Sequence, residues 1–565
     1  MIVQVLEEAG VEYVFGIPGG GTMAIFDALY QKQDTIKTIL VRHEQTAAIM
    51  ADACGRATGK PAVIMGQGVF MGSNASFGVM EAFLSSSPMV VITDTSDGNM
   101  PQHPVNQSGS GEYGSIDLQS IFRAMTKFTT LATDPKQSVI GTQLAIKHAT
   151  SGRPGPTCVL MRSAAIVGEV DVESPPFIHP TGGYLNMSKA QAAPTDMARA
   201  VELLAGARNP AIVAGNGVHL SHAHEQLREL AEQWGMPVAT TYKGKSAVAE
   251  THPLSVGMLG VFGQKIGNAA IGDADVILVV GAKMTPQDTV RERPHIIDPN
   301  RQRIIQIDID ERNAGWTFPV ELGLIGDARV ILDQLVEASR PAVEGRAKTN
   351  EVRLRALQQQ KKAKAFFTDA ALEQDSAPAL PQRVVRLIQE TVDPSTLITL
   401  DAGNNRVWMC HYYQTQEPNT VFAPGGTAGM GWALPAALGL KLVRPERPVV
   451  AVTGDGGFVM TAHALSTAVQ YNIPVVCIIM NDSALGMVRH HQHERQIASQ
   501  FESTDHVMLA KGFGALGLQV TDSRELPDAI REAQASGRPA VIDVLIDHGP
   551  NPDDIRASER GSTET

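Results

Sequence analysis

The stretch VVAVTGDGGFVMTAHALSTAVQYNIPVVCIIMNDS, residues 449–483, decides the fold of the region around it. Its two apolar runs, 449–453 and 475–480, have the length and the branched residues of buried strands. The turn GDGG at 454–457 separates the first run from a helical pattern over 458–471. Because parallel neighbours need a crossover between them, usually a helix, this order predicts two parallel strands of one sheet.

The same alternation of short apolar runs and helical patterns continues along the chain in three blocks. Further strands are predicted at 11–16, 38–41, 62–65, 89–93, 211–214, 237–241, 276–280, 303–309, 396–400 and 540–545. Two stretches without this alternation, 169–194 and 341–379, are interpreted as connectors. We therefore predict an α/β protein with three doubly wound parallel-sheet domains, at 1–168, 195–340 and 380–547.

Composition excludes several classes of function. The 565 residues are too many for one compact core. Lys and Arg total 47 against 59 Asp and Glu, a formal net charge of −12, which argues against binding nucleic acid or an anionic membrane. No apolar run approaches the roughly 20 residues of a membrane helix. The four cysteines are scattered without paired spacing, so we expect reduced thiols and a cytoplasmic location.

Polar residues follow both strands of the opening stretch. Asp455 lies in the turn after the first strand, and Asn481 directly follows the second. Since the carboxyl ends of adjacent parallel strands share one edge of a sheet, these side chains are expected to lie together. A carboxylate and an amide oxygen suit Mg²⁺, and the glycines let N–H groups approach an anion. Taken alone, however, Gly-Asp-Gly is more often a tight turn without a ligand.

The spacing makes the motif more specific, because 24 residues, 457–480, lie between its two halves. This arrangement resembles the signature of thiamine-diphosphate-dependent enzymes. The resemblance implies that Asp455, the Asn481 side chain and the main-chain carbonyl of Ser483 hold Mg²⁺ against the diphosphate. The turn that would contact the diphosphate consists of Gly454, Asp455, Gly456 and Gly457.

A second feature lies in the first block, where RHEQTAA at 42–48 is followed by ADACGRATG at 51–59. On its own, Glu44 is most simply a favourable partner of a helix dipole. The two stretches together resemble the first domain of acetohydroxyacid (acetolactate) synthases and their relatives. The resemblance implies that Glu44 is the activating acid, a carboxyl group positioned at the pyrimidine ring of the cofactor for acid–base catalysis.

Three more stretches align by resemblance. GGTAGMG at 425–431 resembles the segment that bends the cofactor, in which Met430 would lie between the two rings and the Ala428 carbonyl would receive an amino hydrogen. Without the resemblance, Met430 would be a core residue. DAGNNRVW at 401–408 resembles a loop that contacts the diphosphate, and GMV at 486–488 a segment that lines the site. The residues implied there are Gly403, Asn404, Asn405, Gly486 and Met487.

The resemblance also implies an assembly. It gives the three domains as pyrimidine-binding, central and diphosphate-binding. Relatives build the active site between the first domain of one chain and the third domain of another. A homodimer or homotetramer with intersubunit active sites is therefore expected.

Several positions depart from the acetohydroxyacid synthase pattern. YGS at 113–115 stands where Phe-Gln-Glu is usual, VFMGSN at 69–74 replaces Gly-Pro-Gly-Ala-Thr-Asn, and His491 replaces a pocket tryptophan. KMTPQ at 283–287 replaces the flavin-contacting Arg-Phe-Asp-Asp-Arg, which argues against bound FAD. Met487 and His491 are expected to shape the substrate end of the site, with His491 as a substrate contact or proton donor.

These features predict a thiamine-diphosphate- and Mg²⁺-dependent enzyme that decarboxylates a 2-oxo acid and joins the product to a second carbonyl compound. Simple decarboxylation stays open as an alternative, as does lyase action on an acyloin or a hydroxyacyl thioester. A catalytically silent regulatory homologue is the alternative from another class. Such a protein would be expected to lack Glu44, Asp455 or Asn481, and all three are present.

Overall fold

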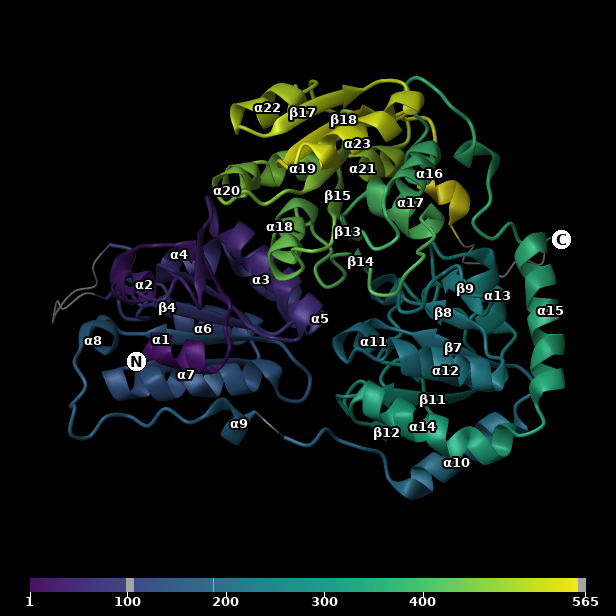
Figure 1. The fold of residues 1–565 in the computed structure, drawn as a ribbon, viewed down its shortest axis with the longest axis horizontal. Helices are drawn as coiled ribbons and strands as arrows, with labels where there is room; N and C mark the ends of the chain where they lie inside the picture. Colours follow the sequence, from purple (N-terminus) through teal and green to yellow (C-terminus); the bar gives the residue numbers. More distant parts are fainter. Residues whose placement is uncertain (98–105, 186, 557–565) are drawn as a thin grey trace.

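Three six-stranded parallel sheets form the frame of the molecule in the computed structural model, which describes residues 1–97, 106–185 and 187–556. Figure 1 shows one sheet in the purple and blue part, one in teal, and one in green and yellow, each flanked by helices. We call these parts the N-terminal, central and C-terminal modules. They confirm the predicted α/β fold with three doubly wound sheets, whereas the predicted domain boundaries stay a prediction.

The N-terminal module has the strand order β2-β1-β3-β4-β6-β5. Its strands are β1 Tyr13–Ile17, β2 Lys37–Leu40, β3 Ala62–Gly66, β4 Met89–Asp94, β5 Phe128–Ala132 and β6 Pro156–Met161. Its helices are α1 Ile2–Glu8, α2 Met23–Tyr30, α3 Glu44–Thr58, α4 Gly68–Ser73, α5 Ser76–Ser85, α6 Leu118–Met125, α7 Pro135–Thr150 and α8 Ser163–Val167. The short helix α9 Thr181–Tyr184 follows in the connector.

The central module has the strand order β12-β11-β10-β7-β8-β9. Its strands are β7 Pro210–Ala214, β8 Val238–Thr240, β9 Ser255–Met258, β10 Val276–Val280, β11 Arg303–Asp308 and β12 Leu322–Ile325. Its helices are α10 Pro194–Gly206, α11 Asn216–Leu220, α12 His224–Trp234, α13 Lys265–Gly272 and α14 Ala328–Val343, and α15 Ala347–Ala363 leads out of it. In Figure 1, α15 runs along the outside of the molecule toward the C-terminal module.

The C-terminal module has the strand order β14-β13-β15-β16-β18-β17. Its strands are β13 Leu397–Leu400, β14 Val421–Phe422, β15 Val449–Gly454, β16 Val476–Asn481, β17 Leu516–Val520 and β18 Ala540–Leu545. Its helices are α16 Pro381–Thr391, α17 Asn404–Tyr412, α18 Ala433–Val443, α19 Asp455–Thr461, α20 Ala464–Gln470, α21 Gly486–Gln492, α22 His506–Gly512 and α23 Leu526–Ala535. Short 3₁₀ helices occur at Gly20–Thr22, Tyr242–Gly244, Ala370–Leu372, Ser523–Glu525 and Pro552–Ile555.

The two outer modules share one topology. Counted within each module, both sheets run in the order second, first, third, fourth, sixth, fifth strand, whereas the central sheet runs third, second, first, fourth, fifth, sixth. In open sheets of this kind, ligands bind beyond the carboxyl ends of the strands, near the point where the strand order reverses. The outer modules therefore offer two equivalent edges, and only one of them carries the predicted metal residues.

In the N-terminal module, the corresponding edge of the sheet is occupied by a carboxylate of the module itself. Asp94, the last residue of its fourth strand β4, is fully buried. Its side chain accepts hydrogen bonds from the main-chain N–H groups of Gly21 (2.9 Å) and Gly68 (3.0 Å), which follow the first and third strands. A Cβ added at Gly68 would lie 1.8 Å from the Asp94 main-chain oxygen, so the backbone needs glycine there.

The N-terminal and C-terminal modules pack through two helices, α3 and α18, whose side chains belong to one hydrophobic cluster. A Cβ added at Gly439 in α18 would lie 2.5 Å from the main-chain oxygen of Met50 in α3, so the helices approach closely because that side chain is absent. Asp52 accepts a hydrogen bond from the indole N–H of Trp432 (2.9 Å) within the same contact. Helix α3 is thus held firmly against the C-terminal module of its own chain.

One predicted helix differs from the structure. The pattern over 458–471 forms two helices, α19 and α20, with a break at Ala462 and His463. At the break, His463 faces α3, where its Nε2 lies 3.0 Å from the hydroxyl oxygen of Thr46. The interruption therefore places a polar contact between the two modules where a continuous helix was expected.

Within the described residues, no helix is both long and apolar enough to cross a membrane. Cys54, Cys158, Cys410 and Cys477 are free thiols, and all four are buried. The free cysteines agree with the expectation of reduced thiols.

Candidate active site

Asp455 begins α19 directly after β15, and its side chain is almost completely buried. The register pairs Gly454 with Met480, so Asp455 and Asn481 come next on adjacent strands, as predicted. One oxygen of Asp455, Oδ2, accepts the main-chain N–H of Ala484 at 3.1 Å. Burial raises the pKa of Asp455 to about 6, and the neighbouring Asp482 adds to the increase. A cation bound beside this buried carboxylate would favour its charged form.

Asn481 ends β16, and its amide is held in one orientation. The side-chain N–H₂ donates to Oδ1 of Asp543 in β18 at 2.9 Å, while the side-chain oxygen faces the main-chain N–H of Ser483 at 3.0 Å. Asp543 is itself buried beside His506, whose Nδ1 lies 3.3 Å from the same oxygen. The arrangement turns the oxygen of Asn481, which is the atom a metal would use, toward the loop after β16.

Ser483 has a left-handed backbone, with φ of 49°. Its main-chain carbonyl accepts the N–H of Phe501 at 3.1 Å. A carbonyl oxygen has two lone pairs, so this bond leaves one for a metal. The predicted metal ligands Asp455, Asn481 and Ser483 therefore come from the ends of β15 and β16 and the loop that follows β16. Their assignment as ligands stays a prediction.

Met430 lies against the glycine turn 454–457. A Cβ added at Gly456 would lie 3.4 Å from Cε of Met430 and 3.0 Å from Cδ2 of Leu485. A Cβ added at Gly457 would lie 2.9 Å from Oγ1 of Thr453. Both glycines of the turn are thus closely surrounded by neighbouring side chains.

Asp401 joins three loops that the sequence assigns to the cofactor. It lies at the end of β13, is almost fully buried, and accepts hydrogen bonds from the N–H of Gly431 (2.8 Å) and of Ala433 (3.3 Å). It also accepts the hydroxyl of Thr453 at 3.1 Å. Asp401 belongs to the DAGNNRVW stretch, from which no function of this residue was predicted. The signal available there was a charged residue at the end of a buried strand.

The loop after β13 places Asn404 and Asn405 near the same edge. Gly403 has φ of 111°, in the left-handed region that favours glycine. The amide N–H₂ of Asn405 donates to the Ala402 carbonyl at 2.9 Å, whereas its buried side-chain oxygen has no partner among the described residues. Asn404 Nδ2 lies 3.1 Å from Nδ1 of His490. These side chains leave polar atoms for a ligand at the edge of the sheet.

The segment 425–431, which we call the bending segment, is gripped by a side chain of the N-terminal module. Glu81 of α5 is fully buried and accepts hydrogen bonds from the main-chain N–H groups of Gly425, Gly426, Thr427 and Ala428. Ala428 has φ of 54°, which is uncommon for a residue with a side chain. Glu81 was not predicted from the sequence, because it lies outside every motif that resembles the family.

Glu44 is the first residue of α3, with 7% of its surface exposed. Its Oε2 accepts the side-chain N–H₂ of Asn74 at 2.9 Å, at the end of α4. The start of α3 lies beside the break after α19, where Thr46 contacts His463. Glu44 of a chain therefore lies at the far end of α19 from Asp455 of the same chain.

Met487 and His491 lie on α21. This helix follows residues 482–485, the loop after β16, which we call the metal loop. Nδ1 of His491 lies 2.7 Å from the main-chain oxygen of Met487, so this nitrogen carries a proton and donates it. The side chain of His491 is exposed. A Cβ added at Gly486 would lie 2.8 Å from Oδ2 of Asp482, so the helix starts close to the metal loop.

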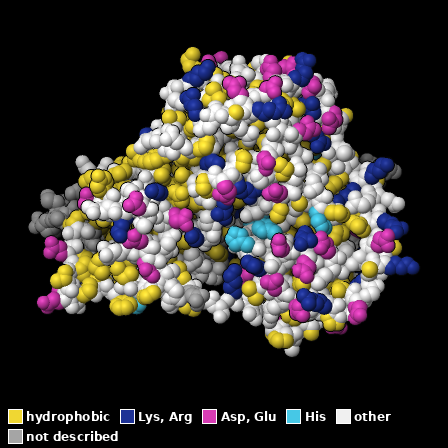
Figure 2. All heavy atoms as spheres, viewed as in Figure 1, with side chains coloured by type: hydrophobic (Ala, Val, Ile, Leu, Met, Phe, Trp, Pro, Cys, Tyr) yellow, Lys and Arg dark blue, Asp and Glu magenta, His cyan; other side chains and the backbone are white. Residues whose placement is uncertain are grey.

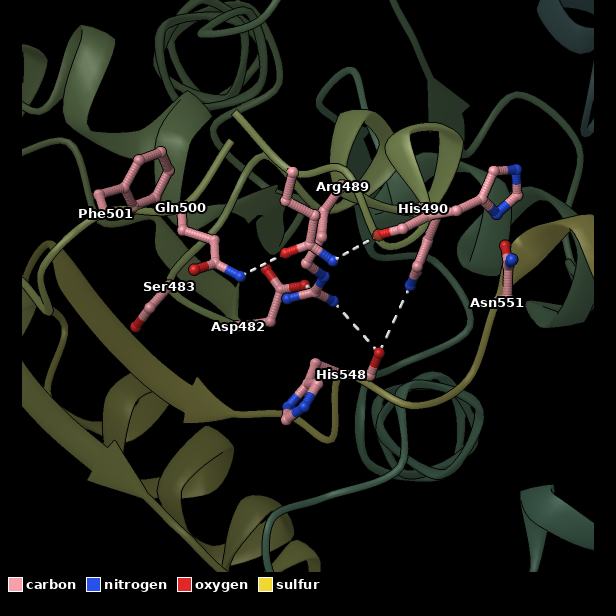
Figure 3. A pocket seen from close by; sticks show the side chains of 10 residues that line it. Asp482, Ser483, Arg489, His490, Gln500, Phe501, His548 and Asn551 are labelled. Carbon is pink, nitrogen blue, oxygen red and sulfur yellow. Dashed lines mark hydrogen bonds and ion pairs between the residues drawn. The ribbon is translucent and has the colours of Figure 1, made fainter. Parts of the chain in front are cut away.

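Beside the metal loop lies a cavity of about 550 Å³, which Figure 3 shows from close by. Its wall consists of Asp482, Ser483, Arg489, His490, His493, Gln496, Gln500, Phe501, His548 and Asn551. Arg489 pairs with Asp482 at 2.8 Å and donates to the His548 main-chain oxygen at 3.2 Å. The guanidinium is thus already neutralised, and the histidines line a polar hollow next to the site.

The described residues fit thiamine diphosphate with a divalent cation. Nowhere in the described ranges could a group of three or more His, Cys, Asp or Glu side chains hold a metal. The fitting set is instead one uncompensated carboxylate, one oriented amide oxygen and one main-chain oxygen, which is what Mg²⁺ takes beside a phosphate. The side-chain oxygen of Asn405, which has no hydrogen-bond partner among the described residues, lies at the same edge as the glycine turn.

Family models cover most of the chain. Residues 1–108 match the thiamine pyrophosphate enzyme N-terminal TPP-binding domain, 197–335 its central domain, and 401–544 its C-terminal TPP-binding domain. Thiamine pyrophosphate is another name for thiamine diphosphate. The three matches fall on the three modules described above.

Curated relatives are similar over nearly the whole chain. The probable acetolactate synthase large subunit of Methanocaldococcus jannaschii is 34% identical over 559 residues, which cover 97% of this chain and 91% of that protein. The acetolactate synthase large subunit of Corynebacterium glutamicum is 32% identical, with coverages of 96% and 86%. Acetolactate synthase isozyme 3 large subunit of Escherichia coli K12 is 31% identical, with coverages of 97% and 94%.

Proposed function

Because the chain belongs to the thiamine pyrophosphate enzyme family, we propose that it decarboxylates a 2-oxo acid and joins the product to a second carbonyl compound, as the names of its relatives suggest. Bound thiamine diphosphate supplies the electron sink for such a decarboxylation. The observation that carries the proposal is the joint placement of Asp455 and the oriented oxygen of Asn481 at one sheet edge. Mg²⁺ dependence follows from this pair of oxygen ligands.

The chain's own residues divide the work of holding the cofactor. Asp455, Asn481 and Ser483 hold the cation, and the glycine turn presents N–H groups to the diphosphate. Met430 packs over that turn and supports the bent shape of the cofactor. Glu44 holds a proton at the pyrimidine ring, where a buried carboxyl is well placed for acid–base catalysis.

The position of Glu44 supports a site shared by two chains. In one chain, Glu44 lies at the far end of α19 from Asp455, so a partner's Glu44 is the better candidate for each cofactor. Apolar side chains beside the site support the same idea. Val459 and Met460, on α19, are 50% and 54% exposed. Figure 2 shows further hydrophobic side chains gathered over the N-terminal module. A homodimer, alone or within a homotetramer, would cover such surfaces.

The substrate end differs from the pattern of the usual acetohydroxyacid synthases. His491 stands in place of a tryptophan, and its imidazole can accept or return a proton. This observation favours simple decarboxylation as the second candidate, because that outcome needs a proton at the reacting carbon in place of a second substrate. Lyase action on an acyloin or a hydroxyacyl thioester uses the same site in reverse.

The central module supports an enzyme without flavin. Its crevice lies between β7 and β10, where the strand order reverses. A Cβ added at Gly217 would lie 2.6 Å from Cα of Gly281, so the loops after these two strands touch each other there. Together with KMTPQ at 283–287, this contact argues against FAD. A cytoplasmic location, with reduced thiols, completes the proposal.

A paired substrate screen tests the function. Purified protein with thiamine diphosphate and Mg²⁺ is offered each of a set of 2-oxo acids, with and without aldehydes or a second oxo acid. We expect CO₂ release that stops without Mg²⁺, and a hydroxy ketone when an acceptor is present. Release of CO₂ with only an aldehyde product would establish the decarboxylase instead. If the protein does not bind thiamine diphosphate, the remaining alternative is a catalytically silent regulatory homologue.

A further inference from the structure

We infer that Glu81 is a positioning residue of the cofactor site, whose carboxylate fixes the backbone of the bending segment and thereby the direction of the Ala428 carbonyl. The inference rests on thiamine diphosphate as cofactor and on the expected contact of that carbonyl. It adds a residue from outside every cofactor motif in the sequence. Glu81 acts through the backbone that it holds and touches no reacting atom.

Four consecutive main-chain N–H groups converge on the Glu81 carboxylate. Gly425 and Gly426 each donate to Oε1 at 3.0 Å, and Thr427 donates to Oε2 at 2.7 Å. Ala428 donates to the same Oε2 at 3.3 Å, and the Thr427 hydroxyl adds a bond of 2.8 Å. Successive N–H groups can point at one anion only when the backbone curls around it. The carboxylate therefore selects the curled form of this segment.

One residue of the curled segment has an unfavourable backbone conformation. Ala428 sits at φ of 54°, where a Cβ crowds the backbone, so the conformation persists only if its surroundings enforce it. A Cβ added at Gly426 would lie 2.6 Å from Cβ of Leu84, so α5 presses directly on the segment. Both the N–H bonds and this packing come from α5. Without Glu81, Ala428 would lose the bonds that offset its unfavourable φ.

Glu81 is itself held in place and in its charged form. Arg56 of α3 donates to its Oε1 at 2.7 Å, and the Ser85 hydroxyl donates to the same atom at 2.6 Å. Burial alone would raise the pKa of Glu81, but the Arg56 charge, the Ser85 hydroxyl and the Gly426 N–H hold it far below its usual value. The same Nη2 of Arg56 also donates to Oδ2 of Asp52 at 2.7 Å, and its Nε donates to Oδ1 of Asp52 at 3.0 Å. These contacts favour the charged form of the Glu81 carboxylate.

The same contacts connect Glu81 to the helix that begins with Glu44. Arg56 and Asp52 lie on α3, and a Cβ added at Gly78 of α5 would lie 2.5 Å from Cβ of Ala48. Helices α3 and α5 therefore pack as one unit. This unit carries the activating carboxyl at one end and the support of the bending segment at the other.

The test compares Glu81→Gln with the unaltered protein, both first freed of cofactor. Hydrogen–deuterium exchange reports the N–H groups of residues 425–428 without any ligand. We expect exchange about tenfold faster or more, because the variant loses charged hydrogen bonds. The dissociation constant for thiamine diphosphate should rise by about the same factor or more. The dissociation constant for Mn²⁺ with inorganic pyrophosphate should change less than about twofold, because pyrophosphate lacks the two rings of thiamine.

Glu250→Gln is the matched control. Glu250 is also fully buried, pairs with Lys245 at 2.7 Å, and accepts the N–H of Thr415 at 2.9 Å, which joins the central and C-terminal modules. Its loss should lower stability and leave cofactor affinity unchanged. Equal effects of the two variants on thiamine diphosphate affinity would overturn the inference, and so would unchanged exchange at 425–428 in Glu81→Gln.

A milder variant covers the case in which Glu81→Gln does not fold. Thr427→Val removes one donor to Glu81 and keeps the side-chain shape. We expect a rise of about threefold to tenfold in the dissociation constant for thiamine diphosphate, the loss of one bond to a charged acceptor. An unchanged constant would contradict the inference. If the unaltered protein binds no thiamine diphosphate, the proposed function fails, while the exchange experiment still decides whether Glu81 holds the segment.

Discussion

Asn481 and Asp543 face each other across two paired strands, with the amide nitrogen 2.9 Å from the carboxylate oxygen. Because the carboxylate accepts only, it settles which end of the amide points toward the metal loop. Asp543 thus orients the predicted metal ligand Asn481 as a supporting carboxylate orients a ligating histidine in other metal sites.

Replacing Asp543 by Leu should weaken cation binding. The amide of Asn481 would lose its fixed orientation, and we expect the dissociation constant for Mn²⁺ with thiamine diphosphate to rise about tenfold to a hundredfold. Electron paramagnetic resonance of free Mn²⁺ measures it. Asp547→Leu, on the same segment but bonded to the N–H of Gly549, is the control. An unchanged Mn²⁺ affinity in folded Asp543→Leu protein would refute the assignment.

Glu44→Gln should separate cofactor binding from turnover. The amide keeps the shape and the bond to Asn74 but cannot exchange a proton, so we expect turnover to fall about a hundredfold or more. The dissociation constant for thiamine diphosphate should stay within about threefold of that of the unaltered protein. Steady-state kinetics and fluorescence titration provide the two values. Full activity in this variant would show that another group activates the cofactor.

A buried lysine should make stability depend on pH. The Nζ of Lys361 donates to the Pro253 carbonyl at 2.8 Å, and burial lowers its pKa from 10.5 to about 8. The folded protein releases this proton near pH 8, whereas the unfolded chain keeps it until about 10.5. The free energy of unfolding therefore gains a contribution that is complete above pH 10.5 and lost as pH falls through 8.

Lys361→Met removes that contribution. Relative to the unaltered protein, the variant should lose melting temperature progressively as pH rises from 8 to 10, by a few degrees in total. Differential scanning fluorimetry at a series of pH values measures it. Lys362→Met, on the exposed neighbouring residue, should show no such trend. A constant difference for Lys361→Met across this window would count against the burial effect.

The purified protein should be colourless and should not retain FAD. The loops after β7 and β10 approach each other closely at Gly217 and Gly281, and KMTPQ replaces the flavin-contacting segment. The protein is incubated with FAD and then separated from free FAD by gel filtration. Absorption spectra recorded before and after this treatment show whether FAD is retained. A flavin band in proportion to the protein would show that the crevice opens.

Much of the fold could be predicted from sequence because its inner strands are continuous apolar runs. Strands β10 and β18 occur where predicted, and β3, β4, β7 and β15 differ by a residue at an end. Those that the patterns missed are mainly at or near sheet edges. Strand β14 has only two residues, and β17 mixes glycine and glutamine into LGLQV. Short or mixed strands pair because a neighbour offers hydrogen bonds, which no local pattern records.

The site was predictable where function depends on local spacing. Asp455 and Asn481 follow strands that are adjacent in the sheet, so their proximity could be inferred from the chain alone. Glu81 and Asp543 could not, since each acts on a segment distant in sequence, and their partners are set by packing. The functions assigned to Glu44, Met430, Met487 and His491 stay predictions.

The carboxylate of Asp94 shows how two copies of one architecture can come to differ. In the N-terminal module it occupies the sheet edge that corresponds to the predicted diphosphate-binding edge of the C-terminal module. Because this anion is part of the chain, the N–H groups of Gly21 and Gly68 are already bonded and are not offered to a dissolved phosphate.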